Sequence, residues 1–344
     1  MEQTDIKSLT LEELRAELLK RGEKAFRADQ LFQWMHEKLA EDISQMTNLP
    51  KAFREWLETE YEYVTLEIVE VQRSKLDGTC KYLFRLRDGH VIESVLMRYH
   101  HGNSVCISSQ VGCRMGCRFC ASTIGGLKRN LRPSEMLEQV YRIQRESGER
   151  VSNVVVMGTG EPLDNYDNLV RFLRLLSHEK GLHVSQRSIT VSTCGIVPNI
   201  YKLAEEDLAI TLALSLHATT QEKRRELMPV ANRYELSEVL DACAAYFRKT
   251  GRRLTLEYSL VSGVNDSRED ASALAALAGP LHAHVNLIPV NPVTERDFVE
   301  PGEKIIDNFK KNLEKCGINA TLRREMGRDI DGACGQLRRK YLSD

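Results

Sequence analysis

From residue 100 onward, apolar β-like runs alternate with helical stretches, and this alternation constrains the fold more than any other feature of the chain. Repeated β-α units pack their helices on a parallel sheet. With about six to seven units, an open or incomplete (β/α) barrel fits better than a flat doubly wound sheet, although periodicity alone does not separate the two. The runs are SVCISS, VSNVVVMG, RSITVST, AITLALSL, RRLTLEYSL, AHVNLIPV and INATLRR, and helical stretches include 134–147, 166–178, 235–250 and 302–315.

The first hundred residues have a different pattern. LTLEELRAELLKRG and AFRADQLFQWMHEKLA carry apolar residues at three- and four-residue spacing, which is typical of helices. Alternating β-like runs then follow, and Asp77-Gly78 and Asp88-Gly89 supply turns between them. We expect an N-terminal helical accessory domain at 1–62, an antiparallel β extension at 63–98, and a partial barrel core at 99–344.

The cellular setting follows from charge and hydropathy. The net charge is −1, which excludes a globally basic nucleic-acid binder but not a local basic patch. No apolar run reaches the ~20 residues of a membrane span, and the N-terminus is acidic and amphipathic, unlike a signal peptide. We therefore expect a cytoplasmic protein without a membrane anchor. In that setting nine cysteines indicate metal binding or catalysis in preference to a disulfide framework.

Three cysteines form a C-x3-C-x2-C motif: Cys113, Cys117 and Cys120. Thiolates are the usual protein ligands of Fe–S clusters, and a [4Fe–4S] cube bound by three of them keeps one iron open. The alternatives are three small buried apolar residues, or a zinc site completed by His101 or His217. The spacing argues against zinc, which usually begins with a C-x2–4-C pair and needs a second half.

Active sites of parallel-sheet folds lie at the carboxyl ends of the strands, and unusual residues of this chain follow its β-like runs. Besides the cysteine motif, they are Gly158 to Pro162, Ser192 to Gly195, Ser215 to His217, and Asn291. Glycines let a backbone approach a ligand closely, and Glu161 is able to bond an amine or hydroxyl. A simple βα turn or a helix cap gives the same pattern, so each segment alone is weak evidence.

Three further residues carry possible chemistry. Cys334 lies between small residues near arginines, which favours a thiolate in a closely approached loop, although an arbitrary cysteine is more often inert and buried. Cys106, inside SVCISS, fits the inert alternative even better. Glu93, on an otherwise apolar strand, is either a buried acid or base or a solvent-facing residue.

Basic residues surround the cysteine motif in a stretch, 101–132, that contains no acid. They, together with basic runs later in the chain, could neutralise RNA phosphates, or they could simply be solvated faces. The strip consists of Arg114, Arg118, Lys128, Arg129 and Arg132; the runs are Lys223-Arg224-Arg225, Arg323-Arg324 and Arg338-Arg339-Lys340.

The ordered set of motifs resembles the dual-specificity RlmN family of radical S-adenosylmethionine methyltransferases. The matching segments are SVCISSQVGCRMGCRFCAS, VVMGTGEPLDNYDN, STCG, SLHA, LMPVANRY, GVNDS, HVNLIPVNP and RDIDGACGQL, and the resemblance spans 6–341. It implies methylation of carbon 2 of an adenosine in 23S rRNA, at the peptidyl transferase centre, and in tRNA, 3′ of the anticodon. It also implies a radical SAM barrel of incomplete (β/α)6 type.

The resemblance assigns roles position by position. Cys113, Cys117 and Cys120 would hold the [4Fe–4S] cluster. The positions that match contacts of S-adenosylmethionine are Gly160, Glu161, Ser192, Ser215, Leu216, His217 and Asn291. Cys334 matches the methyl carrier, Cys106 the resolving cysteine that later pairs with it, and Glu93 the proposed proton acceptor.

The implied reaction consumes two S-adenosylmethionine molecules. One methylates Cys334; the second yields a radical that removes hydrogen from that methyl group, whose carbon then adds to the adenine. Cys106 releases the product by forming a disulfide with Cys334, which a reductant must open each turnover. The implied partners are 23S rRNA, tRNA, a flavodoxin-like electron donor and a disulfide reductant, with no membrane and a monomeric state.

Two departures and two rivals bear on this assignment. Thr159 stands where methionine is common in the family and Cys194 where serine is common, and we expect little effect on the reaction type. One rival is the carbon-8 methyltransferase of the resistance type, whose Gly-Glu-Ala and Gln-Cys-Gly-Cys variants are not seen here. The other is a non-catalytic Fe–S protein that binds RNA.

Overall fold

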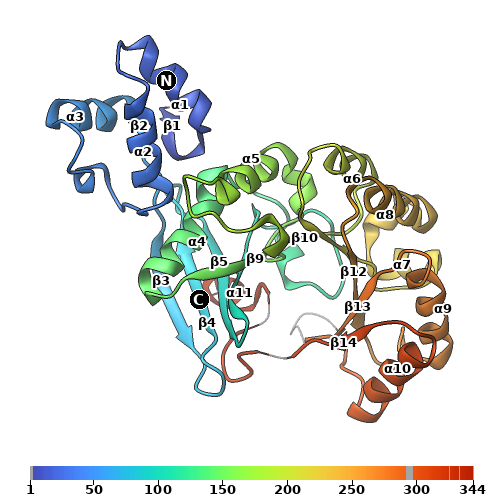
Figure 1. The fold of residues 1–344 in the computed structure, drawn as a ribbon. Helices are drawn as coiled ribbons and strands as arrows, with labels where there is room; N and C mark the ends of the chain where they lie inside the picture. Colours follow the sequence, from blue (N-terminus) through green and yellow to red (C-terminus); the bar gives the residue numbers. More distant parts are fainter. Residues whose placement is uncertain (1–2, 292–296, 325, 333, 344) are drawn as a thin grey trace.

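The computed structural model describes residues 3–291, 297–324, 326–332 and 334–343 (Figure 1). Its main sheet has the strand order β14-β13-β12-β11-β10-β9-β6-β5-β4-β3. Neighbours from β6 to β14 are parallel, whereas β3 to β6 pair antiparallel. The strands are β3 (Glu67–Arg73), β4 (Cys80–Arg85), β5 (Val91–Tyr99), β6 (Gly102–Ile107), β9 (Val151–Val156), β10 (Ile189–Thr193), β11 (Thr211–Ser215), β12 (Leu254–Leu260), β13 (His284–Pro289) and β14 (Ala320–Leu322).

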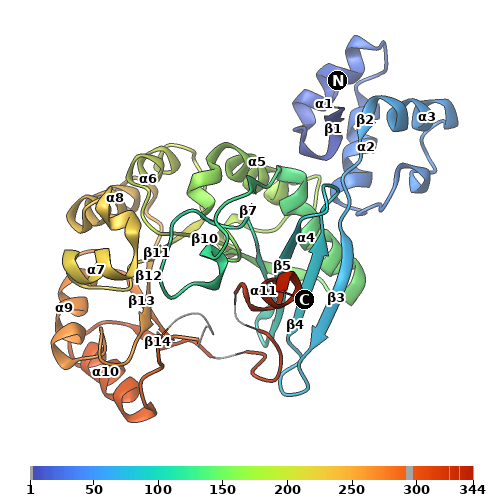
Figure 2. The same ribbon diagram turned by 180° about the vertical axis from the view of Figure 1, so that it is seen from behind.

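Helices connect the parallel strands and cover one side of the curved sheet (Figures 1 and 2). Buried strand residues such as Val154, Leu214 and Leu256 form the core between the layers. The arrangement confirms the incomplete (β/α) barrel, and the four helical stretches given above correspond to α4, α5, α8 and α10. The helices are α4 (Pro133–Ser147), α5 (Tyr166–Ser177), α6 (Val197–Ala204), α7 (Gln221–Leu227), α8 (Leu236–Thr250), α9 (Arg268–Ala278) and α10 (Glu303–Lys315).

The antiparallel strands do not form a separate sheet. β5 pairs with β6, the first parallel strand, so the extension continues the barrel sheet directly. Its tight connections fall at the expected positions, where Gly78 and Gly89 take positive φ values of 73° and 83°. After β14 the chain returns across the barrel mouth and ends in α11 (Gln336–Ser343), which packs against β5 (Figure 2). Strand β6, which begins the parallel part of the sheet, and helix α11, which follows its last strand, thus both contact β5 of the extension.

A small N-terminal module stands beside α4 (Figure 1). It contains β1 (Thr4–Asp5), α1 (Leu11–Lys20), α2 (Phe26–His36), α3 (Lys51–Glu60) and β2 (Tyr61–Glu62), and β1 pairs with β2. Lys7 joins the module to α4, because its Nζ lies 2.7 Å from Oε1 of Glu138 and donates to the carbonyl of Val64 at 2.7 Å. Both charged side chains are fully buried. Among the described residues, no helix has the length and apolar character needed to cross a membrane.

Removing the Lys7 charge tests this junction. We expect Lys7→Met to lower the free energy of unfolding by about 3 kcal/mol, because it removes the buried cation that pairs with Glu138 and leaves Arg145, 3.0 Å away, to balance the buried carboxylate. Lys51→Met is the matched control: Lys51 pairs with Glu55 at 3.6 Å on the surface, and its loss should cost below about 0.5 kcal/mol. Denaturant unfolding measures both, and equal losses in the two variants would contradict the assignment.

Candidate active site

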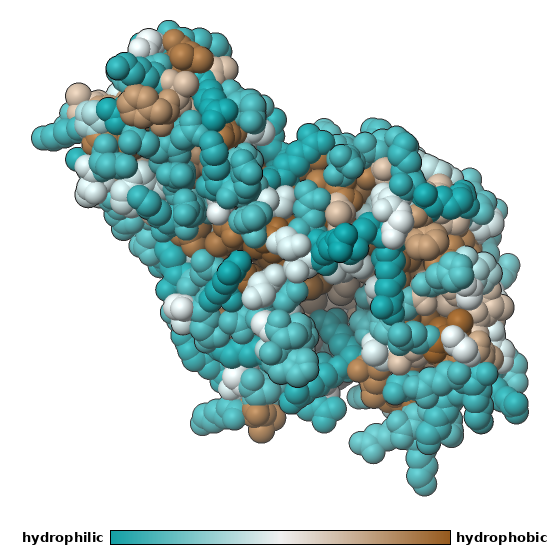
Figure 3. Space-filling model, in the orientation of Figure 1, coloured by the Kyte–Doolittle hydropathy of each residue, from teal (hydrophilic) through white to brown (hydrophobic). Residues whose placement is uncertain are grey.

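A cavity of about 1040 Å³ opens where the parallel strands end, and the molecular surface is hollowed there (Figure 3). Residues from every part of the core sequence line it, as expected for the carboxyl edge of a parallel sheet. Leu216 and Glu93 are the candidate residues that do not line this cavity. Those that do are Cys106, Cys113, Cys117, Cys120, Gly160, Glu161, Ser192, Ser215, His217, Asn291 and Cys334.

The loop with the three-cysteine motif is closed at its base by a short ladder. β7 (Gln110–Val111) pairs antiparallel with β8 (Arg129–Asn130), and the loop continues from Cys120 into a 3₁₀ turn at Ala121–Thr123. Within the loop, the amide of Cys120 donates to the carbonyl of Cys117 at 3.2 Å. The amide of Arg118 donates to the carbonyl of Leu227 at 2.9 Å, which ties the loop to the end of α7. The three thiols therefore share one mouth of the cavity on a tethered loop.

A buried arginine beside this loop bears on whether the three thiols suit an anionic Fe–S cluster. Arg224 is fully buried, and its Nη2 donates to the carbonyl of Cys194 at 2.6 Å. Its Nε and Nη1 have no hydrogen-bond partner among the residues that the structure describes. A buried guanidinium demands a negative partner, and a thiolate-ligated [4Fe–4S] cluster at Cys117 supplies one. The donor set and the local charge fit the cluster.

The zinc alternative has no support. In the described part of the chain, no group of three histidine, cysteine or acidic side chains is arranged to hold a single metal ion. His101 is exposed and stacks on Tyr99, with ring centroids 5.1 Å apart. Cluster ligands bind separate irons, so they need not converge on one point.

Glu161 is held by the strand beside it. Its Oε1 accepts hydrogen bonds from the hydroxyl of Thr193 at 2.7 Å and the amide of Leu163 at 3.1 Å, and its Oε2 accepts from the amide of Cys194 at 2.8 Å. Burial raises the pKa of this carboxyl, and these bonds oppose the rise. Gly160 takes φ 113°, and a Cβ there would lie 2.7 Å from the side chain of Gln110. The Gly-rich turn thus lets two loops approach closely while it presents Glu161.

The neighbouring strand ends carry hydroxyls and an imidazole. The hydroxyls of Ser192 and Ser215, on β10 and β11, lie 3.2 Å apart. Nδ1 of His217 accepts from the amide of Ser259 at 2.9 Å, so the ring proton resides on Nε2. Burial lowers the pKa of His217 to about 3, so the imidazole is a neutral donor. Leu216 is buried below them, and its amide bonds the carbonyl of Glu257 at 3.0 Å.

Cys106 and Cys334 meet in the wall of the same cavity. Their thiols lie within hydrogen-bonding distance of each other, and both are free. The bond from Cys106 lowers the pKa of Cys334 despite burial, and Lys81 and Arg323 lower it further. The same bond and burial raise the pKa of Cys106 well above its usual range. These contacts favour negative charge on Cys334, with Cys106 as the hydrogen-bond donor of the pair.

Glu93 is buried, so the solvent-facing alternative is wrong. Its side chain is 2% exposed and pairs with Lys81 at 2.8 Å. The carboxylate also accepts hydrogen bonds from the amides of Gly335 and of Arg338, the latter at 3.1 Å. Glu93 thus lies behind the Cys334 loop and outside the cavity wall.

Three residues in or next to the cavity are not predicted as site residues from the sequence. Glu257 on β12 is a buried carboxylate in an apolar strand, the same signal that singled out Glu93. Arg323 faces both Cys334 and Cys106 from the cavity wall, and Arg224 lies under the cysteine loop. Each arginine belongs to a short basic run, Lys223-Arg224-Arg225 or Arg323-Arg324, and the sequence alone does not show which member of such a run is buried.

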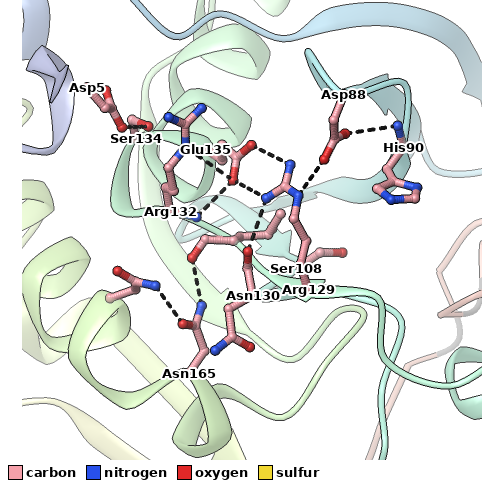
Figure 4. A network of polar contacts seen from close by, with 12 residues as sticks. Asp5, Asp88, His90, Ser108, Arg129, Asn130, Arg132, Ser134, Glu135 and Asn165 are labelled. Carbon is pink, nitrogen blue, oxygen red and sulfur yellow. Dashed lines mark hydrogen bonds and ion pairs between the residues drawn. The ribbon is translucent and has the colours of Figure 1, made fainter. Parts of the chain in front are cut away.

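The basic strip near the cysteine motif is largely neutralised within the fold (Figure 4). Arg129 bonds Glu135 at 2.8 Å and lies 2.5 Å from Asp88. Arg132 pairs with Glu62 at 2.6 Å, and Arg114 pairs with Asp164. Acids distant in sequence therefore pair with these three arginines, so they are not simply solvated side chains.

The comparisons with known proteins agree on one family. A family described as "Radical SAM superfamily" matches residues 107–275, and "Ribosomal RNA large subunit methyltransferase N-terminal domain" matches residues 4–62. Two relatives named "Probable dual-specificity RNA methyltransferase RlmN", from Lachnospira eligens and Lachnoclostridium phytofermentans, are 63% and 62% identical; each alignment covers 99% of this chain, and 97% and 96% of the relative. A crystal structure of a radical SAM methyltransferase from Sphaerobacter thermophilus matches with TM-score 0.93 and 44% identity, covering 97% of this chain and 98% of that one.

The buried Glu257 makes stability depend on pH. Burial raises its pKa from 4.5 to about 7, although the bond from Asn286 and the charge of Arg323 lower it. A carboxyl with a raised folded pKa costs stability above its unfolded pKa, and the full cost is reached above pH 7. Glu257→Gln has no such charge to bury. We therefore expect its free energy of unfolding, relative to that of the wild type, to rise by about 2 kcal/mol as the pH is raised from about 5 to about 8. Unfolding curves at both pH values measure this gain, and a pH-independent difference would contradict it.

Proposed function

The chain belongs to the RlmN family, and on that premise we propose that it methylates carbon 2 of adenosine in 23S rRNA and in tRNA, using Cys334 as the carrier of the methyl group. The observation that carries the proposal is the pair of free thiols, Cys106 and Cys334, in the cavity that the three-cysteine loop also lines. A radical initiator alone needs only the cysteine loop. A second, separate pair of thiols fits a carrier and its resolving partner.

The substrate atom explains why such machinery is needed. Carbon 2 of adenine lies in an electron-poor amidine and is not a nucleophile, so it does not attack a sulfonium methyl donor directly. Cys113, Cys117 and Cys120 would hold a [4Fe–4S] cluster, and the chemistry it would supply when bound and reduced is one-electron cleavage of S-adenosylmethionine. Glu161, Ser192, Ser215, His217 and Asn291 line the adjoining wall, where carboxylate, hydroxyl, imidazole and amide groups suit the polar ends of that cofactor.

Cys334 acts first as a nucleophile. Its lowered pKa provides a thiolate, which takes a methyl group from one S-adenosylmethionine by displacement. A hydrogen atom of that methyl group would pass to the 5′-deoxyadenosyl radical derived from a second S-adenosylmethionine, giving 5′-deoxyadenosine. The remaining carbon radical would bond to carbon 2, and the adduct that joins the RNA to Cys334 would give up one electron to the oxidised cluster. Arg323 and Lys81 both stabilise the negative sulfur at the start of this sequence.

Release of the product requires a base and a second thiol. Cys106 attacks the sulfur of Cys334, forms a disulfide and frees the methylated base. We assign the carbon-2 proton to Glu93, with Cys106 as the second candidate. In the structure Glu93 accepts hydrogen bonds from the amides of Gly335 and Arg338, which follow Cys334 in the chain, so its carboxylate is bonded directly to the segment that carries the sulfur.

The partners follow from this chemistry. An external one-electron donor, of flavodoxin type, serves the cluster, and a thiol reductant opens the Cys106–Cys334 disulfide after each turnover. We propose that the chain acts as a monomer. The carbon-8 rival is disfavoured because Glu161-Pro162 and Val111-Gly112 stand where its characteristic variants would be.

Cys334→Ala tests the carrier role. We expect complete loss of 2-methyladenosine from ribosomal and transfer RNA after anaerobic reaction, with the cluster content unchanged because Cys334 is not a ligand. Nucleoside mass spectrometry against 2-methyl- and 8-methyladenosine standards measures the product, and iron analysis measures the cluster. Normal methylation by the variant would refute the carrier role, and 8-methyladenosine from the wild type would refute the substrate position.

Cys106→Ala tests the resolving role separately. We expect protein covalently joined to RNA to accumulate, because the bond between Cys334 and the base forms but no thiol is present to break it. Denaturing gel electrophoresis of the reaction shows the adduct, and nuclease treatment should remove it. Free methylated RNA at the normal turnover rate is the result that would count against this assignment.

A further inference from the structure

Residues 326–332 and 334–335, named here the carrier loop, lie along the antiparallel extension and continue into α11. Three side chains near the end of β3 and the following turn bind the loop's polar groups. Gln72 bonds both the amide and the carboxylate of Asp331, at 2.9 Å and 3.0 Å. The hydroxyl of Ser74 donates to Asp329 at 2.6 Å, and Asp77 accepts from the amide of Gly327 at 2.9 Å. Polar contacts therefore follow the loop from its start to within a few residues of Cys334.

The carboxylate of Asp77 stays charged while it holds the loop. Burial raises its pKa, but the bonds from the amides of Gly327 and Thr79 outweigh that effect and lower the pKa to about 2. A charged acceptor makes the stronger hydrogen bond to an amide. This contact therefore persists across the pH range in which the protein works.

The next contacts come from one face of β5. Alternate residues of a strand share a face, and here the face carries Val91, Glu93, Val95 and Met97. Leu337 of α11 packs with Val91, and Met326 of the carrier loop packs with Val95 and Met97. Between these apolar contacts, Glu93 binds the amides of Gly335 and Arg338, so it caps the first turn of α11.

Lys81 completes this arrangement from the next strand. The β4–β5 register pairs Lys81 with Val95 and Leu83 with Glu93, so Lys81 and Glu93 are diagonal neighbours on the same face. Their side chains are 0% and 2% exposed, and their charged atoms are 2.8 Å apart. Lys81 therefore places a cation against the same carboxylate that binds the two amides, within the buried contact between the extension and the carrier loop.

The loop is confined on its other side as well. Gly335 has φ 81°, and a Cβ there would lie 2.9 Å from the amide nitrogen of Ser122, just after the cluster ligand Cys120. Cys106, on β6, is the register partner of Val95. Cys334 therefore lies between the contacts that the extension makes with the loop and the close approach of Gly335 to Ser122.

We propose that Lys81 and Glu93 are positioning residues, and that the antiparallel extension is the dock that sets the sulfur of Cys334 against Cys106 and the cavity. The assignment rests on the proposed carrier role of Cys334. It gives the extension a function in the reaction, which is to fix the nucleophile for methylation, in addition to the proton transfer proposed above for Glu93.

The test compares Lys81→Met, Lys81→Arg and Lys7→Met in the full-length holoenzyme under anaerobic conditions. Lys7→Met is the matched control, because it removes the lysine of a second buried Lys–Glu pair that does not touch the carrier loop. Hydrogen exchange of the peptide that spans 327–343 and alkylation of Cys334 by iodoacetamide, located by peptide mass spectrometry, report the dock without depending on methyl transfer.

We expect Lys81→Met to speed exchange at Gly335 and Arg338, and alkylation of Cys334, by about tenfold or more. Lys7→Met should leave both rates within about twofold of the wild type. RNA methylation by Lys81→Met should lose kcat at an unchanged KM for RNA, and Lys81→Arg should restore part of kcat. Wild-type exchange in Lys81→Met, or equal increases in Lys81→Met and Lys7→Met, would overturn the proposal.

Gln72→Ala keeps the test decisive if Lys81→Met does not fold. This change removes both bonds to Asp331 from strand β3 at the sheet edge, and it should accelerate exchange in 327–335. Unchanged exchange there would also overturn the dock. If exchange responds as expected but Cys334→Ala methylates RNA normally, the dock stands and the carrier role fails.

Discussion

The contact between the thiols of Cys106 and Cys334 is the interaction on which the rest of the structure depends. It joins the first parallel strand to the last loop, residues separated by most of the core sequence. Two isolated buried thiols would be inert. Here the two thiols lie together beside Lys81 and Arg323, and their pKa values diverge. Cys334 accepts the hydrogen bond and the nearby cations favour its negative charge, so its pKa falls, whereas the pKa of Cys106 rises. In the proposed reaction the two members of this pair serve as the nucleophile and its resolving partner.

The parallel sheet and its site edge could be predicted from the sequence. Buried strands such as VVVM and the helices between them have strong periodicity, and the carboxyl ends of parallel strands must meet. This constraint alone places Glu161, Ser192, Ser215 and His217 beside the cysteine motif. The spacing of Cys113, Cys117 and Cys120 also needed no structure, because it reports ligand chemistry directly.

The remaining features depend on contacts distant in sequence, which periodicity does not contain. Cys106 and Cys334 looked inert when considered singly, and only a family resemblance linked them. Alternation along the strand leaves open whether Glu93 is buried or faces solvent, because it does not show which face of the antiparallel extension is covered by a later part of the chain. In the structure the carrier loop and α11 cover the face that carries Glu93. Arg129 and Arg132 looked like phosphate ligands because their partners, Asp88 and Glu62, lie in other segments. Cys194 and Thr159 depart from the family pattern, yet part of their contacts does not depend on the side chain: the Cys194 amide binds Glu161, and the Thr159 carbonyl accepts from the amide of Ser109.

The central claim is that Cys334 carries the methyl group, and it can be tested before any RNA is present. Holoenzyme is incubated with S-adenosylmethionine bearing a deuterated methyl group, and the label is located by peptide mass spectrometry. One labelled methyl group is expected on Cys334 and none on Cys106, because the surrounding charges and the bond from Cys106 favour a thiolate on Cys334. Label that reaches RNA on its later addition without ever residing on Cys334 would contradict the account.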